Sequence, residues 1–286
     1  DKRNYINEAG CGNTINMDHP QVRRMVLDSL RYWVEEFGVD GFRFDLAPIL
    51  GRTHGKFTRE APFFKEIESD PVLSKVKLIA EPWDCGNDGY HVGGFPKGWL
   101  EWNGKFRDDV RKYWRGDSFM TGALATRLAG SSPEYDHSGR TPQESINFVT
   151  CHDGFTMEDL VSYNSKHNLA NKEGNRDGCN DNHSANNGVE GETDSPEINR
   201  LRQQQKRNML ATLFLAQGTP MMLAGDETGN SQNGNNNAYC QDNEIGWVNK
   251  EKLSTEDREL KAFVQKLIAF RKENAVLTQP RFLHGQ

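Results

Sequence analysis

Side chains of the kinds that catalyse reactions lie at the ends of several apolar segments. The clearest case is Val39–Ala47 (VDGFRFDLA), which alternates as a strand does. Phe42 and Phe44 share one face of this strand. Arg43 and Asp45 share the other face. Because a guanidinium favours the ionised form of a neighbouring carboxylate, this strand end suits a site that needs a charged aspartate.

Three further segments end in polar, mostly acidic residues: Glu81 after Val76–Ala80, His152–Asp153 after Ile146–Cys151, and Asp226–Glu227 after residues 218–225. Carboxylates that meet at one site suit glycoside hydrolysis. One carboxylate acts as the nucleophile, and a carboxylic acid ~5–5.5 Å away protonates the leaving oxygen in enzymes that retain the anomeric configuration. Crowding raises the pKa of the acid, so a cluster of carboxylates supplies both roles.

Helices must separate these strands if the strand ends are to meet. Apolar residues recur at helical spacing over Pro20–Phe37, where Pro20 suits the first turn and Gly38 the stop. The other expected helices are residues 57–73, 105–114, 121–130, 195–217 and 255–273, the last capped by Ser254. Trp99–Asn103 is a short apolar piece that leads into the third of these six helices.

Alternating strands and helices predict an α/β fold with a parallel sheet and crossover helices. In a (β/α)8 barrel of the TIM type the active site lies at the carboxyl ends of the strands. We therefore expect Arg43 and Asp45 to face the lumen at its rim, while Phe42 and Phe44 pack outward against helices.

Composition limits the possible functions. The 286 residues carry a net charge of -6, which argues against nucleic acid or an anionic membrane as partner. The five cysteines are scattered and lack any C-x-x-C spacing, so neither a disulfide framework nor a zinc site is indicated and a reducing cytoplasm is preferred. We see no apolar run of ~18 residues and no signal peptide. No cofactor or metal is indicated, although structural calcium stays possible.

Several motifs resemble one enzyme family. DGFRFDLA, LIAEPWD and FVTCHDG are similar to consecutive signature regions of the α-amylase superfamily, glycoside hydrolase family 13. GCGNTINMDHP, EWNGKFRDDVR and GNNNAYCQDN resemble its bacterial glycogen debranching and isoamylase branch. The resemblance implies a retaining glycoside hydrolase with a barrel fold that cleaves α-1,6 branch linkages of glycogen or limit dextrin, so the expected partner is a branched α-glucan.

The resemblance also assigns roles by position. Asp45 is the expected nucleophile, Glu81 the general acid/base and Asp153 the stabiliser of the transition state. Arg43 and His152 are expected to contact the nucleophile and the sugar hydroxyls. Two tryptophans, Trp83 and Trp102, could stack on sugars or pack in the core. Of the two, we expect Trp83 to bind substrate.

The family's earlier signature, which ends in Asn-His on the third barrel strand, is not found. Only 38 residues precede Val39, whereas three βα units need roughly three times ~30 residues. We therefore expect a barrel truncated to strands four to eight, with residues 1–275 as the partial catalytic domain and residues 276–286 as the start of a carboxyl-terminal β-domain. The abrupt start without Met also favours a fragment or a processed product, with little or no debranching activity on its own.

Other functions remain open at this point. A metal-dependent hydrolase would use the same residue types, but Arg43 beside Asp45 would repel a cation. A fragment could bind glucan without catalysis, and a relative in the same superfamily could hydrolyse α-1,4 linkages or transfer glucan chains. Asp226–Glu227 suit a turn or scaffold as well as a substrate contact. The Asn-rich stretches 162–195 and 229–243 suit either solvated loops or sugar binding.

Overall fold

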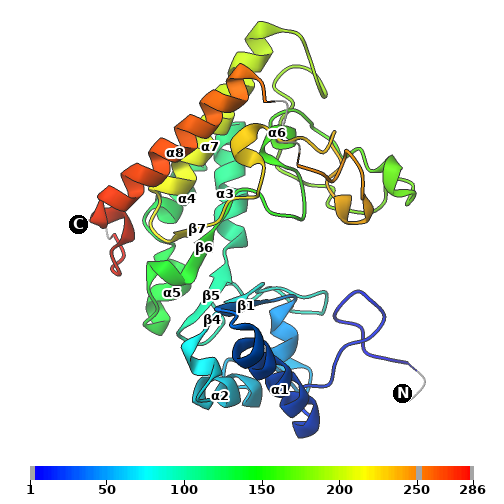
Figure 1. Ribbon diagram of the computed structural model, residues 1–286, viewed down its shortest axis with the longest axis vertical. Helices are drawn as coiled ribbons and strands as arrows, with labels where there is room; N and C mark the ends of the chain where they lie inside the picture. Colours follow the sequence, from blue (N-terminus) through cyan, green and yellow to red (C-terminus); the bar gives the residue numbers. More distant parts are fainter. Residues whose placement is uncertain (1–3, 249–252, 284–286) are drawn as a thin grey trace. The chain divides into compact units, whose positions relative to one another are not determined.

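The structure is a computed structural model that describes residues 4–248 and 253–283 (Figure 1). The chain divides into two compact units. The first unit consists of residues 1–103 and 132–146, and the second of residues 104–131 and 147–286.

Parallel strands form the centre of the first unit: β1 (Gly41–Phe44), β4 (Lys77–Ala80), β5 (Trp99–Trp102) and β6 (Ser145–Asn147), whose last residue belongs to the second unit. β1 and β4 approach closely at Gly41, where a Cβ would lie 2.4 Å from the Lys77 carbonyl oxygen. Only glycine fits there. A small antiparallel pair, β2 (Arg52–Thr53) and β3 (Lys56–Phe57), lies outside this sheet.

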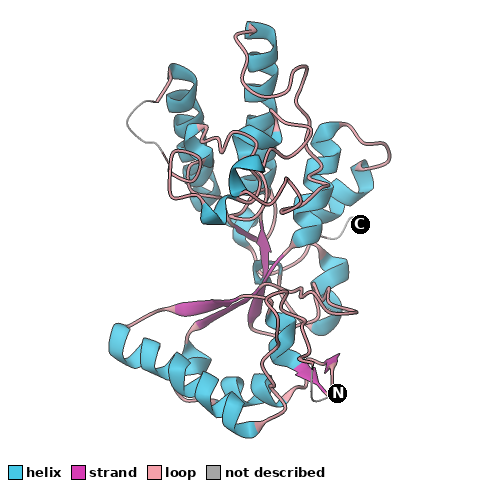
Figure 2. Cartoon of the chain, turned by 90° about the vertical axis from the view of Figure 1, so that its right-hand side faces the viewer, coloured by secondary structure: helices cyan, strands magenta, loops and turns pink. Residues whose placement is uncertain are grey.

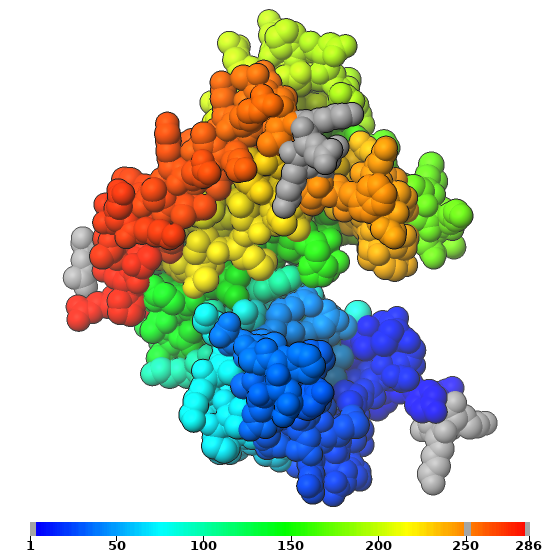
Figure 3. Space-filling model, viewed as in Figure 1, coloured from blue at the N-terminus to red at the C-terminus, as the bar shows by residue number. Residues whose placement is uncertain are grey.

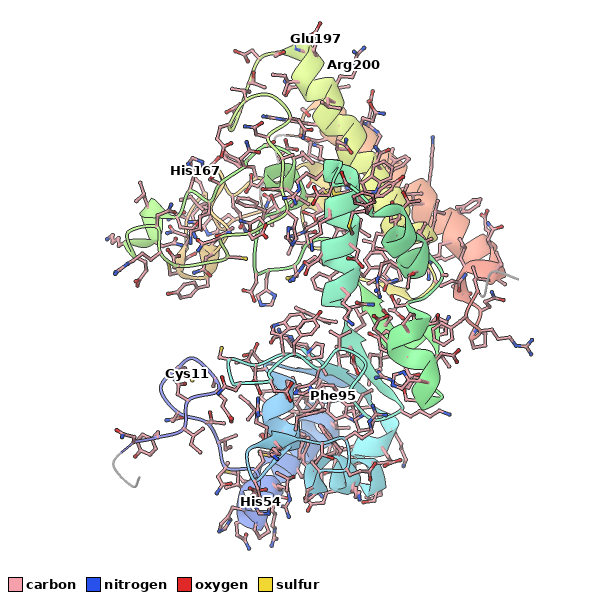
Figure 4. The ribbon with its side chains drawn as sticks, turned by 180° about the vertical axis from the view of Figure 1, so that it is seen from behind. Cys11, His54, Phe95, His167, Glu197 and Arg200 are labelled. Carbon is pink, nitrogen blue, oxygen red and sulfur yellow. The ribbon has the colours of Figure 1, made fainter. Side chains whose placement is uncertain are left out.

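The helices of the first unit are α1 (Pro20–Phe37), α2 (Pro62–Ser69) and α5 (Ser132–Tyr135), with 3-10 turns at Ala47–Gly51, Leu73–Lys75, Asp136–Ser138 and Pro142–Glu144. Figures 1 and 2 show α1 and α2 on the same side of the strands. Phe44 packs against Phe63 of α2 and against Trp99 of β5. Phe95, labelled in Figure 4, is fully buried in the same core. The outward packing expected for Phe44 is thus confirmed.

An ion pair in the first unit was not foreseen from the sequence. The side chains of Arg140 and Glu101 are both completely buried and bonded to each other. Arg140 also donates to the Trp99 carbonyl oxygen at 2.5 Å. The other oxygen of Glu101 accepts the Gly93 N–H at 2.5 Å. Since every one of these groups is shielded from water, the pair fixes the loop before β5 to the strand itself.

Helices dominate the second unit: α3 (Gly104–Arg115), α4 (Thr121–Leu128), α6 (Met157–Leu160), α7 (Pro196–Leu215) and α8 (Thr255–Glu273), with the short strand β7 (Thr219–Pro220) and 3-10 turns at Leu169–Asn171, Asp226–Thr228, Ala238–Cys240 and Ala275–Thr278. α7 and α8 run side by side (Figure 1). Ser254 caps α8 by accepting the Asp257 N–H at 3.0 Å, as expected from the sequence.

Strands of the main sheet are shorter than the sequence indicated, and one strand of this sheet, like the small pair β2–β3, was not expected. The strand order is β1-β4-β5-β6-β7. The apolar piece Trp99–Asn103 is strand β5, whereas the expected strand Ile146–Cys151 shrinks to β6. The expected strand after Gln217 shrinks to the two residues of β7. A parallel order with crossover helices confirms the α/β class.

The two Asn-rich stretches are joined to each other by hydrogen bonds through buried asparagines, while many of their other residues are exposed. We name residues 162–195 loop L1 and residues 229–243 loop L2. Asn236 lies between the loops and is almost completely buried. Its side-chain nitrogen donates to the Asn182 side-chain oxygen, and its own oxygen accepts from the Asn168 side chain, both at 2.8 Å. Figure 3 shows the two loops in contact on one face of the unit.

Other expectations have mixed outcomes. None of the five cysteines is in a disulfide, and Cys151 is buried while the other four are exposed. Of the five, Cys151 alone therefore packs as a small buried side chain. In the described ranges, no helix is both long and apolar enough to span a bilayer. The proposed β-domain at residues 276–286 stays a prediction, because residues 284–286 lie outside the described ranges.

Candidate active site

The site in the first unit begins at the carboxyl end of β1. Arg43, on the face opposite Phe42 and Phe44, places its Nη1 2.7 Å from Oδ1 of Asp45. The Asp45 side chain is 72% exposed, so its other oxygen is open to a substrate. This arrangement is the one expected from the alternation of the strand.

The turn after Asp45 has an unusual backbone. Leu46 adopts the left-handed conformation, with φ 43° and ψ 48°. A bulky residue in this region costs about 1–3 kcal/mol. The conformation aims the Leu46 N–H at Oε2 of Glu81, 2.8 Å away. Two backbone bonds of 3.0 Å, from Ala47 N–H to the Glu81 carbonyl oxygen and from Glu81 N–H to the Phe44 carbonyl oxygen, hold the strained turn in place.

Glu81 combines burial with nearby charge. It is 4% exposed, and its Oε2 lies 3.0 Å from Nη2 of Arg43. Burial, with a smaller contribution from the neighbouring Asp45, raises the pKa of Glu81 to about 7 against the opposing effects of the Leu46 N–H and Arg43. A carboxyl group with such a pKa carries a proton near neutral pH, as a general acid requires.

Arg43 is held by an aromatic ring as well as by carboxylates. Its guanidinium carbon lies 4.4 Å from the ring centre of Trp102, a distance typical of cation–π contacts. Trp102 is 7% exposed, so core packing describes it better than sugar stacking. The ring thus supports the side chain that joins Asp45 to Glu81.

Trp83 lies two residues after Glu81 and is half-buried. Its ring stacks on Tyr90, with centroids 6.0 Å apart and planes 8° from parallel. An antiparallel bridge joins the backbones of the same two residues. Tyr90 is 47% exposed, and no signal in the sequence paired it with Trp83. The stacked rings form a partly exposed aromatic surface close in sequence to Glu81.

His152 and Asp153 belong to the second unit, so the site in the first unit consists of Arg43, Asp45 and Glu81. The side chains of His152 and Asp153 are 58% and 66% exposed, and Nε2 lies 3.6 Å from Oδ2. They occupy an irregular segment after β6. Gly154 follows with φ 96°, and a Cβ there would meet nothing within 4 Å, so the backbone angle rather than space requires glycine.

Asp226 and Glu227 both use their carboxylates in hydrogen bonds within the fold. Asp226 is completely buried. Its Oδ2 accepts a hydrogen bond from the Thr150 hydroxyl, and its Oδ1 accepts the Met157 N–H at 2.9 Å. Burial raises the pKa of Asp226 to about 7. Glu227 accepts the Gly225 N–H at 2.9 Å. The sequence left open whether Asp226 and Glu227 stabilise a turn or contact substrate, and these hydrogen bonds support a structural role.

The carboxylate pair at this site has a positively charged side chain beside it. No group of three or more His, Cys, Asp or Glu side chains within residues 4–248 and 253–283 is arranged to hold an ion. Between the carboxylates of Asp45 and Glu81 lies the guanidinium of Arg43, whose positive charge repels a cation.

Comparison with known proteins defines the class first. Residues 11–117 match the α-amylase catalytic domain. These residues belong to the α-amylase family of glycoside hydrolases, family 13. The fold of the chain resembles pullulanase from Bacillus acidopullulyticus, with a TM-score of 0.70 and 24% identity over 96% of this chain and 31% of that protein. The type I pullulanase of Bacillus subtilis complexed with maltose gives the same TM-score and identity. The expected partial (β/α)8 barrel is thereby confirmed.

Curated relatives narrow the resemblance to particular proteins. The chain is 54% identical over 286 residues to the "Glycogen operon protein GlgX homolog" of Mycobacterium tuberculosis, covering 100% of this chain and 40% of that protein. It is 51% identical over 279 residues to the "Glycogen debranching enzyme" of Erwinia tasmaniensis, covering 98% of this chain and 42% of that protein. The chain thus spans about 40% of the length of these relatives.

Proposed function

We propose that this chain is the catalytic segment of a longer retaining glycoside hydrolase that cleaves α-1,6 branch linkages of glycogen or limit dextrin. The observation that carries the proposal is the buried Glu81, whose pKa is raised to about 7 while Arg43 joins it to the exposed Asp45. A proton donor next to an accessible carboxylate is the pair that a double displacement needs.

Each residue then has a chemical role. Asp45 attacks the anomeric carbon of the branch while Glu81 protonates the glycosidic oxygen, so the main chain leaves with a neutral C6 hydroxyl and the branch stays bound to Asp45 as a glycosyl ester. Glu81, now ionised, removes a proton from the water that cleaves the glycosyl–Asp45 ester. Arg43 donates a hydrogen bond to Oδ1 of Asp45 and so orients this carboxylate for the attack. We assign Asp153 to stabilisation of the oxocarbenium-like transition state and His152 to the sugar hydroxyls.

The substrate class rests on the relatives, which are named glycogen debranching enzymes. The aromatic surface of Trp83 and Tyr90 suits the apolar face of a glucosyl unit, which supports Trp83 as a substrate-binding residue. We place the protein in the cytoplasm, because its five cysteines are unpaired and disulfides are rare in that compartment. With a net charge of -6, neither nucleic acid nor an anionic membrane is an expected partner.

Stereochemistry tests the proposal most directly. NMR of the full-length protein acting on limit dextrin should show the α-anomer of the released chain before mutarotation. The Asp45→Asn variant serves as the control and should release no product. A β-anomer appearing first would exclude the double displacement. Faster cleavage of linear amylose than of limit dextrin would instead favour an α-1,4-glucan hydrolase or transglycosylase.

A further inference from the structure

The segment that carries His152 and Asp153 needs a physical explanation for its position. It has no helix or strand between β6 and α6, and both functional side chains are mostly exposed. Packing of their own side chains and a regular backbone pattern therefore do not fix His152 and Asp153, whereas the neighbouring Cys151 and Phe155 are buried. The position of Asp153 depends on whatever fixes the residues on either side.

A single buried carboxylate holds both ends of this segment. The side chain of Asp226 accepts the Thr150 hydroxyl on one oxygen and the Met157 N–H, at 2.9 Å, on the other. These two partners bracket residues 151–156. Asp226 itself lies in a 3-10 turn after β7, about seventy positions along the chain from both partners, so the two bonds join the segment to a separate part of the second unit.

The middle of the segment has anchors of its own. The Gly154 N–H donates to the carbonyl oxygen of Asn236 at 3.0 Å. Asn236 belongs to L2, and its side chain is held by Asn168 and Asn182 of L1. In addition, the buried thiol of Cys151 donates to the Asp153 carbonyl oxygen at 3.2 Å. The backbone around Asp153 is therefore fixed before, at and after this residue.

We propose that Asp226 is a positioning residue for catalysis, and that its paired hydrogen bonds to Thr150 and Met157 hold Asp153 where the transition state needs it. The inference rests on the proposed function, because it assumes that Asp153 acts on the sugar. It assigns to Asp226 an indirect role, since the carboxylate is buried and touches the catalytic segment rather than the substrate.

Hydrogen-bond geometry predicts different effects for two substitutions. Asp226→Asn keeps an oxygen for the Met157 N–H and offers its amide nitrogen to the Thr150 oxygen, so both ends of the segment stay attached. Asp226→Ala removes both bonds. Because a misplacement of ~1 Å can lower a rate ~10²-fold, Asp226→Ala should lower kcat by roughly that factor in the full-length enzyme, with KM changed less than about threefold.

A matched control separates positioning from general stability. Asp159 is also completely buried, accepts the Ser231 hydroxyl at 2.5 Å and the Gln232 N–H at 2.9 Å, and has a pKa raised to about 6 by burial. Both of these side-chain partners lie in L2, outside residues 150–157. Asp159→Ala should therefore destabilise the protein to a similar extent as Asp226→Ala while kcat, measured well below the melting temperature, stays within about threefold of the wild type.

The deciding measurements are steady-state kinetics on limit dextrin and amide hydrogen exchange of residues 150–157. We expect Asp226→Ala to lower kcat and to speed hydrogen exchange at Met157 at least tenfold. Asp226→Asn should have kcat and exchange close to those of the wild type. Asp159→Ala should change neither quantity. Equal kcat losses in Asp226→Ala and Asp159→Ala, or unchanged exchange in Asp226→Ala, would overturn the proposal. If Asp226→Ala does not fold, Thr150→Val removes one of the two bonds and is judged by the same criteria.

Failure of the proposed function gives a different result. A wild-type enzyme without debranching activity, or an Asp153→Asn variant with full activity, would refute the role of Asp153 in catalysis. Hydrogen exchange at Met157 would still show whether Asp226 holds the segment. An inactive Asp153→Asn variant beside a fully active Asp226→Ala variant would refute the inference about Asp226 alone.

Discussion

Replacing Glu81 by glutamine tests the central feature of the site. Glutamine has nearly the same shape and can still accept the Leu46 N–H, but it has no proton to give. With a pKa of about 7, about half of the Glu81 carboxyls are protonated at pH 7, against about 0.3% for a carboxyl at the ordinary value of 4.5. The raised pKa thus supplies about 160 times more of the active acid at this pH.

We expect Glu81→Gln to lower kcat/KM on limit dextrin by ~10²–10⁴-fold, the usual contribution of general acid catalysis. A substrate with an activated leaving group needs less protonation, so the glycosylation step should recover much of that loss. Asp45→Asn should show no such recovery, because it lacks the nucleophile. The exposed Glu68→Gln on α2 is the control and should retain wild-type kinetics.

The pH dependence gives a second readout from the same variant. Wild-type kcat/KM should fall about tenfold per pH unit above a midpoint near pH 7, as Glu81 of the free enzyme loses its proton. In Glu81→Gln this alkaline limb should disappear. An unchanged limb in the variant, or equal rescue of Glu81→Gln and Asp45→Asn by the activated substrate, would show that the acid has been assigned to the wrong residue.

Three further outcomes follow from the geometry. Arg140→Met should lower the free energy of unfolding by ~3–5 kcal/mol in urea denaturation, because it leaves the buried Glu101 charge unpaired; a change below about 1 kcal/mol would contradict this. Arg43→Lys should lower kcat, since one ammonium cannot bond both carboxylates and cover Trp102 as the guanidinium does; wild-type kcat would refute that role. Finally, Asp226 has a folded pKa of about 7, above its unfolded value of 3.8, so the folded state binds more protons between these values. The contribution of Asp226 to the free energy of unfolding should therefore fall as pH rises from about 4 to 7 and stay constant above pH 7. In Asp226→Asn, the difference in the free energy of unfolding between pH 5 and pH 8, measured by denaturation, should be smaller than in the wild type.

Local signals were enough to predict the main helices and the acid. Pro20 begins α1, and Ser254 caps α8, as their positions in the sequence indicated. Glu81 could be found because Pro82 ends the strand and leaves the carboxylate at its end. In each case the decisive interaction lies within a few residues of the chain.

Interactions between distant residues could not be read from the sequence. β5 was missed as a strand because it carries Glu101, whose partner Arg140 lies 39 positions further along the chain. The left-handed conformation of Leu46 has no sequence signal, since leucine rarely adopts it. The scaffold role of Asp226 was only one of two readings, because an acid at a strand end looks the same whether it faces solvent or the core.

The hydrogen bonds between asparagines of L1 and L2 also constrain how the sequence of this protein can change during evolution. Asn168 and Asn236 each donate to and accept from the other, and Asn171 and Asn235 do the same. Losing one member leaves a buried polar group unpaired, at a cost of about 1–3 kcal/mol. Because Asn236 also donates to Asn182 and Asn171 also donates to Asp177, replacing one pair leaves further partners unpaired. Substitutions in L1 and L2 should therefore be inherited in groups, so that the two loops diverge as one unit.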